Sequence, residues 1–129
     1  MSEAVREFFE RDISFKSPED IVGEIFQEWR RLQDAPPERR EERIKSAARR
    51  IKNEVCECNH PVVKKMIDFG TAKGKLECAR TLERIIQDLL SRGIKSTEDV
   101  KEIEEAVEGF KRGLMEYVEN RFLKGRRRS

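Results

Sequence analysis

The sequence has few of the residues that stabilise small secreted proteins or anchor membrane proteins. It contains three cysteines and one histidine among 129 residues, and an odd cysteine count argues against a disulfide framework. No apolar run approaches the ~20 residues that a membrane-spanning helix needs. The acidic N-terminal segment, MSEAVREFFERD, has no apolar stretch of the signal-peptide kind. We therefore expect a cytoplasmic protein without a membrane partner.

A strong net charge is also missing. The 28 Lys and Arg residues nearly balance the 26 Asp and Glu residues, which leaves a net charge of +2. Charged residues still make up 42% of the chain, against roughly 25% in typical domains, an enrichment that is common in thermophile proteins. This balance predicts paired surface charges and no nucleic-acid partner. The three arginines of the basic end lack interleaved aromatic residues, so we expect residues 124–129 to form a solvated tail.

Helical periodicity dominates the rest of the chain. Serine followed by proline or by threonine and acidic residues marks two clear helix starts, at Ser17 and at Ser96. No repeat and no strand is expected. We predict an all-α fold in one domain, residues 1–123, as a helical bundle of five to six helices with antiparallel neighbours. The expected helices are 3–13, 18–33, 38–58, a short one within 62–69, 75–92, and one that begins near residue 97 and runs past residue 117.

The last of these helices has the clearest apolar pattern. Its apolar residues alternate three- and four-residue steps, which is the heptad spacing of a bundle seam or a dimer seam. We therefore expect a homo-oligomer, and a non-enzymatic helical oligomer or partner-binding module is one of the functional alternatives. The residues of this seam are Val100, Ile103, Val107, Phe110, Leu114 and Tyr117.

Two glutamate pairs carry the sharpest chemical hypothesis, Glu24 with Glu28 and Glu54 with Glu57. In each pair, one member lies about 60° from the centre of its helix's apolar stripe and the other lies further out. The short connection 34–37 makes the two helices antiparallel neighbours, so both pairs can face one groove. Clustered carboxylates need a positive charge between them, and Mg²⁺ prefers oxygen ligands. The alternative is four solvated glutamates on a highly charged surface.

The surrounding segments resemble a known family. IVGEIFQEW (Ile21–Trp29) and APPERREERIKSAARRIKNEVCE (Ala35–Glu57) are similar to the acidic helices of the all-α nucleoside triphosphate pyrophosphohydrolases, the group of MazG, HisE and the dimeric dUTPases. This resemblance implies that the four glutamates ligate Mg²⁺. It also implies hydrolysis of a nucleotide substrate to its monophosphate and pyrophosphate. Trp29 offers a ring for nucleobase stacking, although its place on the apolar stripe favours core packing.

A zinc site is the second metal hypothesis. All three cysteines and the only histidine lie within residues 56–78, and together they contain a tetrahedral ligand set. If the helix persists to residue 58, the first two cysteines point about 160° apart and cannot share an ion. The zinc hypothesis therefore depends on a helix that ends before Glu54. Its ligands would be Cys56, Cys58, His60 and Cys78.

Overall fold

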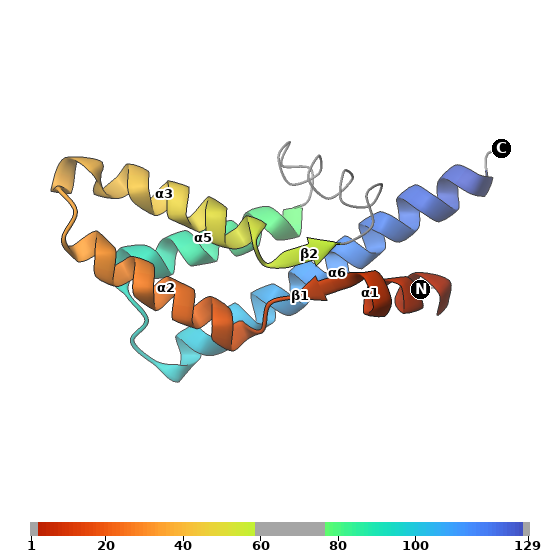
Figure 1. Cartoon of the computed structure of the whole chain (residues 1–129), viewed down its shortest axis with the longest axis horizontal. Helices are drawn as coiled ribbons and strands as arrows, with labels where there is room; N and C mark the ends of the chain where they lie inside the picture. Colours follow the sequence, from red (N-terminus) through yellow and green to blue (C-terminus); the bar gives the residue numbers. More distant parts are fainter. Residues whose placement is uncertain (1–2, 59–76, 128–129) are drawn as a thin grey trace.

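The computed structural model describes residues 3–58 and 77–127, and these residues are mostly helical, as predicted. The predicted helix within 62–69 lies outside the described residues, so the expected helix count stays a prediction. The elements, in chain order, are α1 (Glu3–Asp12), β1 (Ile13–Phe15), α2 (Pro18–Gln33), α3 (Pro37–Asn53), β2 (Cys56–Cys58), α5 (Glu77–Arg92) and α6 (Thr97–Arg127) (Figure 1).

The boundaries of α2 follow from local chemistry. The Ser17 side chain accepts a hydrogen bond from the backbone N–H of Asp20 at 3.2 Å, and Pro18 occupies the first turn. Two prolines lie just beyond the end of α2, and the second of them, Pro37, begins α3. With so short a connection, α2 and α3 run antiparallel, as the sequence predicts (Figure 1).

The core lies among α2, α3, α5 and α6. Helix α5 packs against both α3 and α6, and α2 contacts the other three. Between α3 and α5, the buried Lys52 ammonium lies 3.2 Å from a carboxylate oxygen of Glu83. Each fully buried Leu, Ile or Phe side chain contributes about 1.5–3 kcal/mol relative to exposure. The largest fully buried side chains are Ile21, Ile25, Ile51, Val55, Leu82, Ile86, Leu89, Leu90, Ile103, Phe110 and Leu114.

The apolar seam of α6 faces this core. Ile103, Val107, Phe110 and Leu114 are all buried within the chain. Most of the seam therefore packs inside the bundle, and Val100 and Tyr117 at its two ends are half-buried. Helix α6 continues through the expected basic tail to Arg127, and Figure 1 shows its C-terminal turns reaching beyond α2, α3 and α5.

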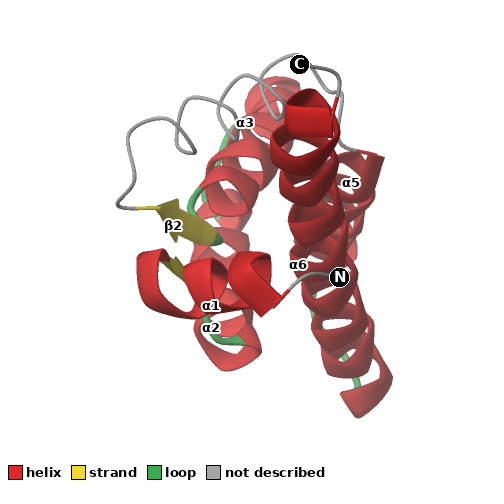
Figure 2. Cartoon of the chain, turned by 90° about the vertical axis from the view of Figure 1, so that its right-hand side faces the viewer, coloured by secondary structure: helices red, strands yellow, loops and turns green. Residues whose placement is uncertain are grey.

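A strand pair corrects two predictions. The helix expected over 38–58 ends at Asn53, and the expectation that no strand would form is wrong. Strand β2 instead pairs antiparallel with β1, with Ile13 opposite Cys58 and Phe15 opposite Cys56. The pairing brings apolar side chains into the core: Phe15 packs edge-on against Phe110, with ring centroids 6.3 Å apart. Figure 2 shows β2 next to α1, on the side of the bundle away from α5.

Candidate functional site

Three of the four predicted glutamates meet in one ion-pair network. Lys16, between β1 and α2, places its Nζ 3.0 Å from Glu24 Oε1 and 3.6 Å from Glu54 Oε2. Arg50 on α3 bridges in the same way, 2.7 Å from Glu28 Oε1 and 3.5 Å from Glu54 Oε2. We call these five residues the α2–α3 network. It joins the middle of α2 to the end of α3, so the predicted convergence of the two helices' carboxylates is real for three of them.

Basic side chains occupy the place that the sequence assigned to a metal. Arg31 adds a third cation, 2.9 Å from Glu28 Oε1, so three carboxylates face three positive charges. The hydrogen bond to Glu24 raises the pKa of Lys16 above its ordinary value. Among the described residues, no group of three or more His, Cys, Asp or Glu side chains is placed to hold a metal ion. As arranged, the network does not fit Mg²⁺.

One oxygen of the network is under-satisfied. Glu24 Oε2 is buried and has no hydrogen-bond partner in the described part of the chain. Lys16 holds this carboxylate through Oε1 alone. Loss of Lys16 would therefore leave a carboxylate that is three-quarters buried without its cation, since the Glu24 side chain is only 26% exposed.

The fourth predicted ligand, Glu57, lies outside the network. Because α3 ends at Asn53, Glu54 caps that helix and Glu57 falls in β2. There it is exposed and opposite Ser14. The spacing that would put Glu54 and Glu57 on one helical face therefore does not apply. Sequence reasoning also missed Lys16 and Arg50, although the four-residue spacing of Arg50 and Glu54 on one helix was a visible signal.

The early end of α3 satisfies the condition that the zinc hypothesis required. His60 lies outside the described residues, so the complete ligand set stays a prediction. Cys78 is half-buried on α5, with its Sγ 3.9 Å from the Phe110 carbonyl oxygen. Burial raises the pKa of the Cys78 thiol, which opposes formation of the thiolate that zinc requires.

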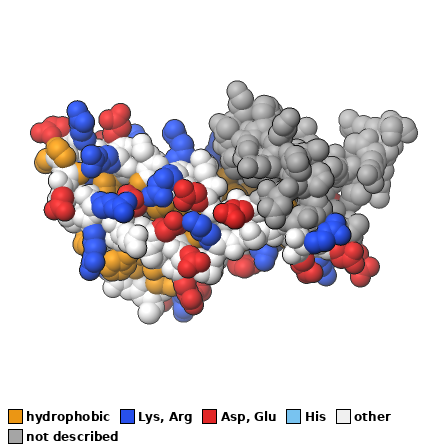
Figure 3. All heavy atoms as spheres, viewed as in Figure 1, with side chains coloured by type: hydrophobic (Ala, Val, Ile, Leu, Met, Phe, Trp, Pro, Cys, Tyr) orange, Lys and Arg blue, Asp and Glu red, His pale blue; other side chains and the backbone are white. Residues whose placement is uncertain are grey.

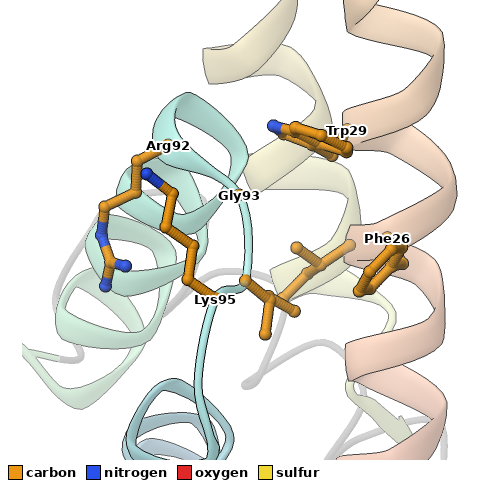
Figure 4. A pocket seen from close by; sticks show the side chains of 7 residues that line it. Phe26, Trp29, Arg92, Gly93 and Lys95 are labelled. Atoms are coloured by element: carbon orange, nitrogen blue, oxygen red, sulfur yellow. The ribbon is translucent and has the colours of Figure 1, made fainter.

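A second candidate site is an apolar pocket that the sequence did not reveal (Figure 4). It lies between α2 and the linker that joins α5 to α6, and its volume is about 160 Å³. Phe26 is 43% exposed, the one large apolar side chain that is exposed among those whose burial the structure describes. We call this site the Trp29 pocket. It is lined by Ile25, Phe26, Trp29, Arg92, Gly93, Ile94 and Lys95.

The linker is shaped by Gly93 and Asp99. Gly93 ends α5 with a φ of +82°, a conformation that favours glycine. A Cβ built there would lie 3.0 Å from Cε2 of Trp29, so the indole packs directly on the glycine. Asp99 accepts hydrogen bonds from the Lys95 N–H at 2.9 Å and from Arg92 Nη2 at 2.8 Å. The linker thus packs against α2, and Trp29 is half-buried as a pocket wall.

The polar groups of the pocket lie on its linker side. Arg92 is paired with Asp88 and Asp99, and this guanidinium lowers the pKa of Asp99 to about 2. The Lys95 ammonium, in contrast, has no ion-pair partner among the described residues. The indole N–H of Trp29 likewise donates to none of them. Figure 4 shows the indole nitrogen on the side where Lys95 and Arg92 lie, opposite Phe26.

A larger groove lies between α1, β1 and α6. Its volume is about 460 Å³, and Lys111 places its Nζ 5.6 Å from the centroid of the Phe15 ring. Charged side chains of both signs line it, so it offers no single kind of ligand chemistry. Its lining residues are Arg6, Glu10, Ile13, Phe15, Lys111 and Met115.

Comparison with known proteins adds no relative. The chain matches no protein-family model, no curated protein and no solved structure. None of the described helices is both long and apolar enough to cross a membrane. Figure 3 shows basic and acidic side chains interspersed over one face of the molecule, as the balanced composition predicts.

Proposed function

We propose that this chain is a non-enzymatic helical binding module whose Trp29 pocket takes one bulky apolar side chain of a partner protein. The exposure of Phe26 in the wall of the pocket carries this proposal. A large apolar side chain left in water is stabilised when a partner covers it, at about 25 cal/mol per Å² of apolar surface removed from water. Aromatic anchors of this kind often dominate protein interfaces.

The volume of the pocket supports a single side chain as the occupant. About 160 Å³ is available, close to the roughly 150 Å³ of an engineered cavity that binds benzene. Pockets for drug-sized ligands and cofactors are larger, at about 300–1,000 Å³. The Trp29 pocket therefore suits one aromatic ring or branched aliphatic group better than a nucleotide.

Selection from a displayed library of random peptides tests this function. Peptides that bind the wild-type protein should be enriched in a bulky apolar residue and should lose binding to Phe26→Asp. Gln27→Asp introduces the same charge at the adjacent exposed position of α2 and should leave binding intact. Selected peptides that bind Phe26→Asp as tightly as the wild type would place the binding surface elsewhere.

Mg²⁺-dependent nucleoside triphosphate pyrophosphohydrolysis is the second candidate function. The convergence of Glu24, Glu28 and Glu54 favours it, although Mg²⁺ would have to displace Lys16 and Arg50 from these carboxylates. The test is incubation with a panel of NTPs and dNTPs plus Mg²⁺, followed by detection of pyrophosphate. Turnover that disappears in Glu54→Ala and persists in Glu42→Ala, an exposed position of α3, would establish the enzyme. Absence of turnover with every nucleotide would remove this candidate.

The expected homo-oligomer is a proposal of the same kind. Because most of the α6 seam is buried in the core, a second copy of the chain would need another apolar surface, and the exposed Phe26 is the one that α2 offers. Analytical ultracentrifugation of wild-type protein and Phe26→Asp tests this directly. Dimerisation at micromolar concentration that Phe26→Asp abolishes would make a second copy the occupant of the pocket.

A further inference from the structure

We infer that the partner segment carries a carboxylate beside the apolar side chain that enters the Trp29 pocket. This inference rests on the proposed binding function and specifies its partner as an acidic peptide segment with an aromatic or branched aliphatic anchor. The observation behind it is the place of Lys95 in the lining of an apolar pocket, with an ammonium that no described residue pairs.

A carboxylate is the group that suits this ammonium, because it carries a negative charge and acceptor oxygens only. A basic flank on the partner would bring a second positive charge toward Lys95, and such like-charge contacts work against a partner.

The other charges near the pocket limit the size of this effect. Arg92 is already paired with Asp88 and Asp99, and Glu102 lies 3.9 Å from it. Lys95 is therefore the one lining cation that is available to a partner among the described residues. A single exposed ion pair changes an affinity by a factor of about 1.4–5, and added salt screens it. We expect a preference of about threefold to fivefold for acidic over neutral flanks.

Trp29 is the only tryptophan of the chain, so its fluorescence reports on the pocket directly. Three blocked peptides serve as probes: Glu-Glu-Phe-Glu-Glu, Gln-Gln-Phe-Gln-Gln and Glu-Glu-Ala-Glu-Glu. The acidic phenylalanine peptide should bind about threefold to fivefold more tightly than the neutral one at low salt, and the alanine peptide should not bind. Lys95→Glu should abolish the preference. Lys101→Glu changes the net charge equally at an exposed position that does not line the pocket, and it should keep the preference.

The possible outcomes test two claims separately, the carboxylate on the partner and the binding function of the Trp29 pocket. Equal affinities for the acidic and neutral phenylalanine peptides would refute the inference that the partner carries a carboxylate. They would leave intact the proposal that the pocket binds an apolar side chain. A preference that survives Lys95→Glu would also refute the carboxylate on the partner. No response to either phenylalanine peptide would refute the binding function itself. A dimer that Phe26→Asp dissociates would replace the partner segment with a second copy of the chain.

Discussion

Substitution of Gly113 by alanine should destabilise the protein, although alanine is the better helix former. Gly113 lies within α6, where this helix packs against α5. A Cβ at this position would lie 2.6 Å from Sγ of Cys78 and 3.2 Å from its Cβ. The first distance is shorter than real side-chain contacts, so α5 and α6 must move apart or Cys78 must change its rotamer.

Two opposing effects decide whether Gly113→Ala raises or lowers the stability of the protein. Alanine gains about 0.5–1 kcal/mol over glycine in a helix interior, whereas overpacking a tight contact costs about 1–3 kcal/mol. We expect a net loss near 1 kcal/mol, which lowers the melting temperature of a chain of this size by about 4 °C. Thermal unfolding followed by circular dichroism, together with urea titration, measures both quantities.

Gly109 provides the matched control on the same helix. A Cβ there would meet no heavy atom within 4 Å, so Gly109→Ala should stabilise the protein by about 0.5–1 kcal/mol. Combining Gly113→Ala with Cys78→Ala should recover most of the loss, measured relative to Cys78→Ala alone in a double-mutant cycle. A Gly113→Ala protein as stable as Gly109→Ala, or a loss that Cys78→Ala does not relieve, would refute the close α5–α6 contact.

Three further predictions concern individual residues. Gly93→Ala should destabilise the protein by about 1–2 kcal/mol, because its φ is left-handed, and should shift the fluorescence maximum of Trp29; unchanged stability and emission would contradict the packing of the indole on the glycine. Arg92 lowers the pKa of Asp99 to about 2, below its ordinary 3.8, so the stabilisation from Asp99 is present above about pH 4 and is lost as the pH falls toward 2. Urea titrations should therefore show a flatter pH dependence for Asp99→Asn than for the wild type in this range, and parallel curves would argue against the pair. In a variant that keeps only Cys78, alkylation at pH 8 should be slower than that of a free thiol, because burial raises the pKa of this thiol; a rate equal to that of the free thiol would show that the site is open.

Helix α2 shows what the sequence could predict. Its cap at Ser17 and its end before the prolines depend on residues within a few positions of one another, and both are confirmed. Its apolar stripe is buried at Ile21, Ile25 and Leu32, whereas Trp29 is half-buried. The pairing of β1 with β2 joins segments about forty residues apart, and no local pattern encodes it. That pairing ends α3 at Asn53 and removes Glu57 from the predicted carboxylate cluster.

The residues of the two candidate sites also divide into those that local periodicity places and those that depend on contacts between distant segments. Helical periodicity correctly placed Glu24 and Glu28 on a face shared with α3, but it gave no sign that Lys16 would reach across from the end of β1. The Trp29 pocket depends on the left-handed Gly93 that turns the linker toward α2. In the sequence Phe26 is one more apolar residue of α2, and nothing in the pattern distinguishes its exposed side chain from the buried Ile21 and Ile25.

The central claim is that the Trp29 pocket is the binding site, and isoleucine-methyl NMR tests it most directly. Ile25 and Ile94 line this pocket, whereas Ile13 lines the groove between α1, β1 and α6. Titration with the acidic phenylalanine peptide should shift the Ile25 and Ile94 methyl signals in proportion to saturation and leave Ile13 unmoved. Shifts at Ile13 with Ile25 and Ile94 unmoved, or no shift at any isoleucine, would contradict the claim.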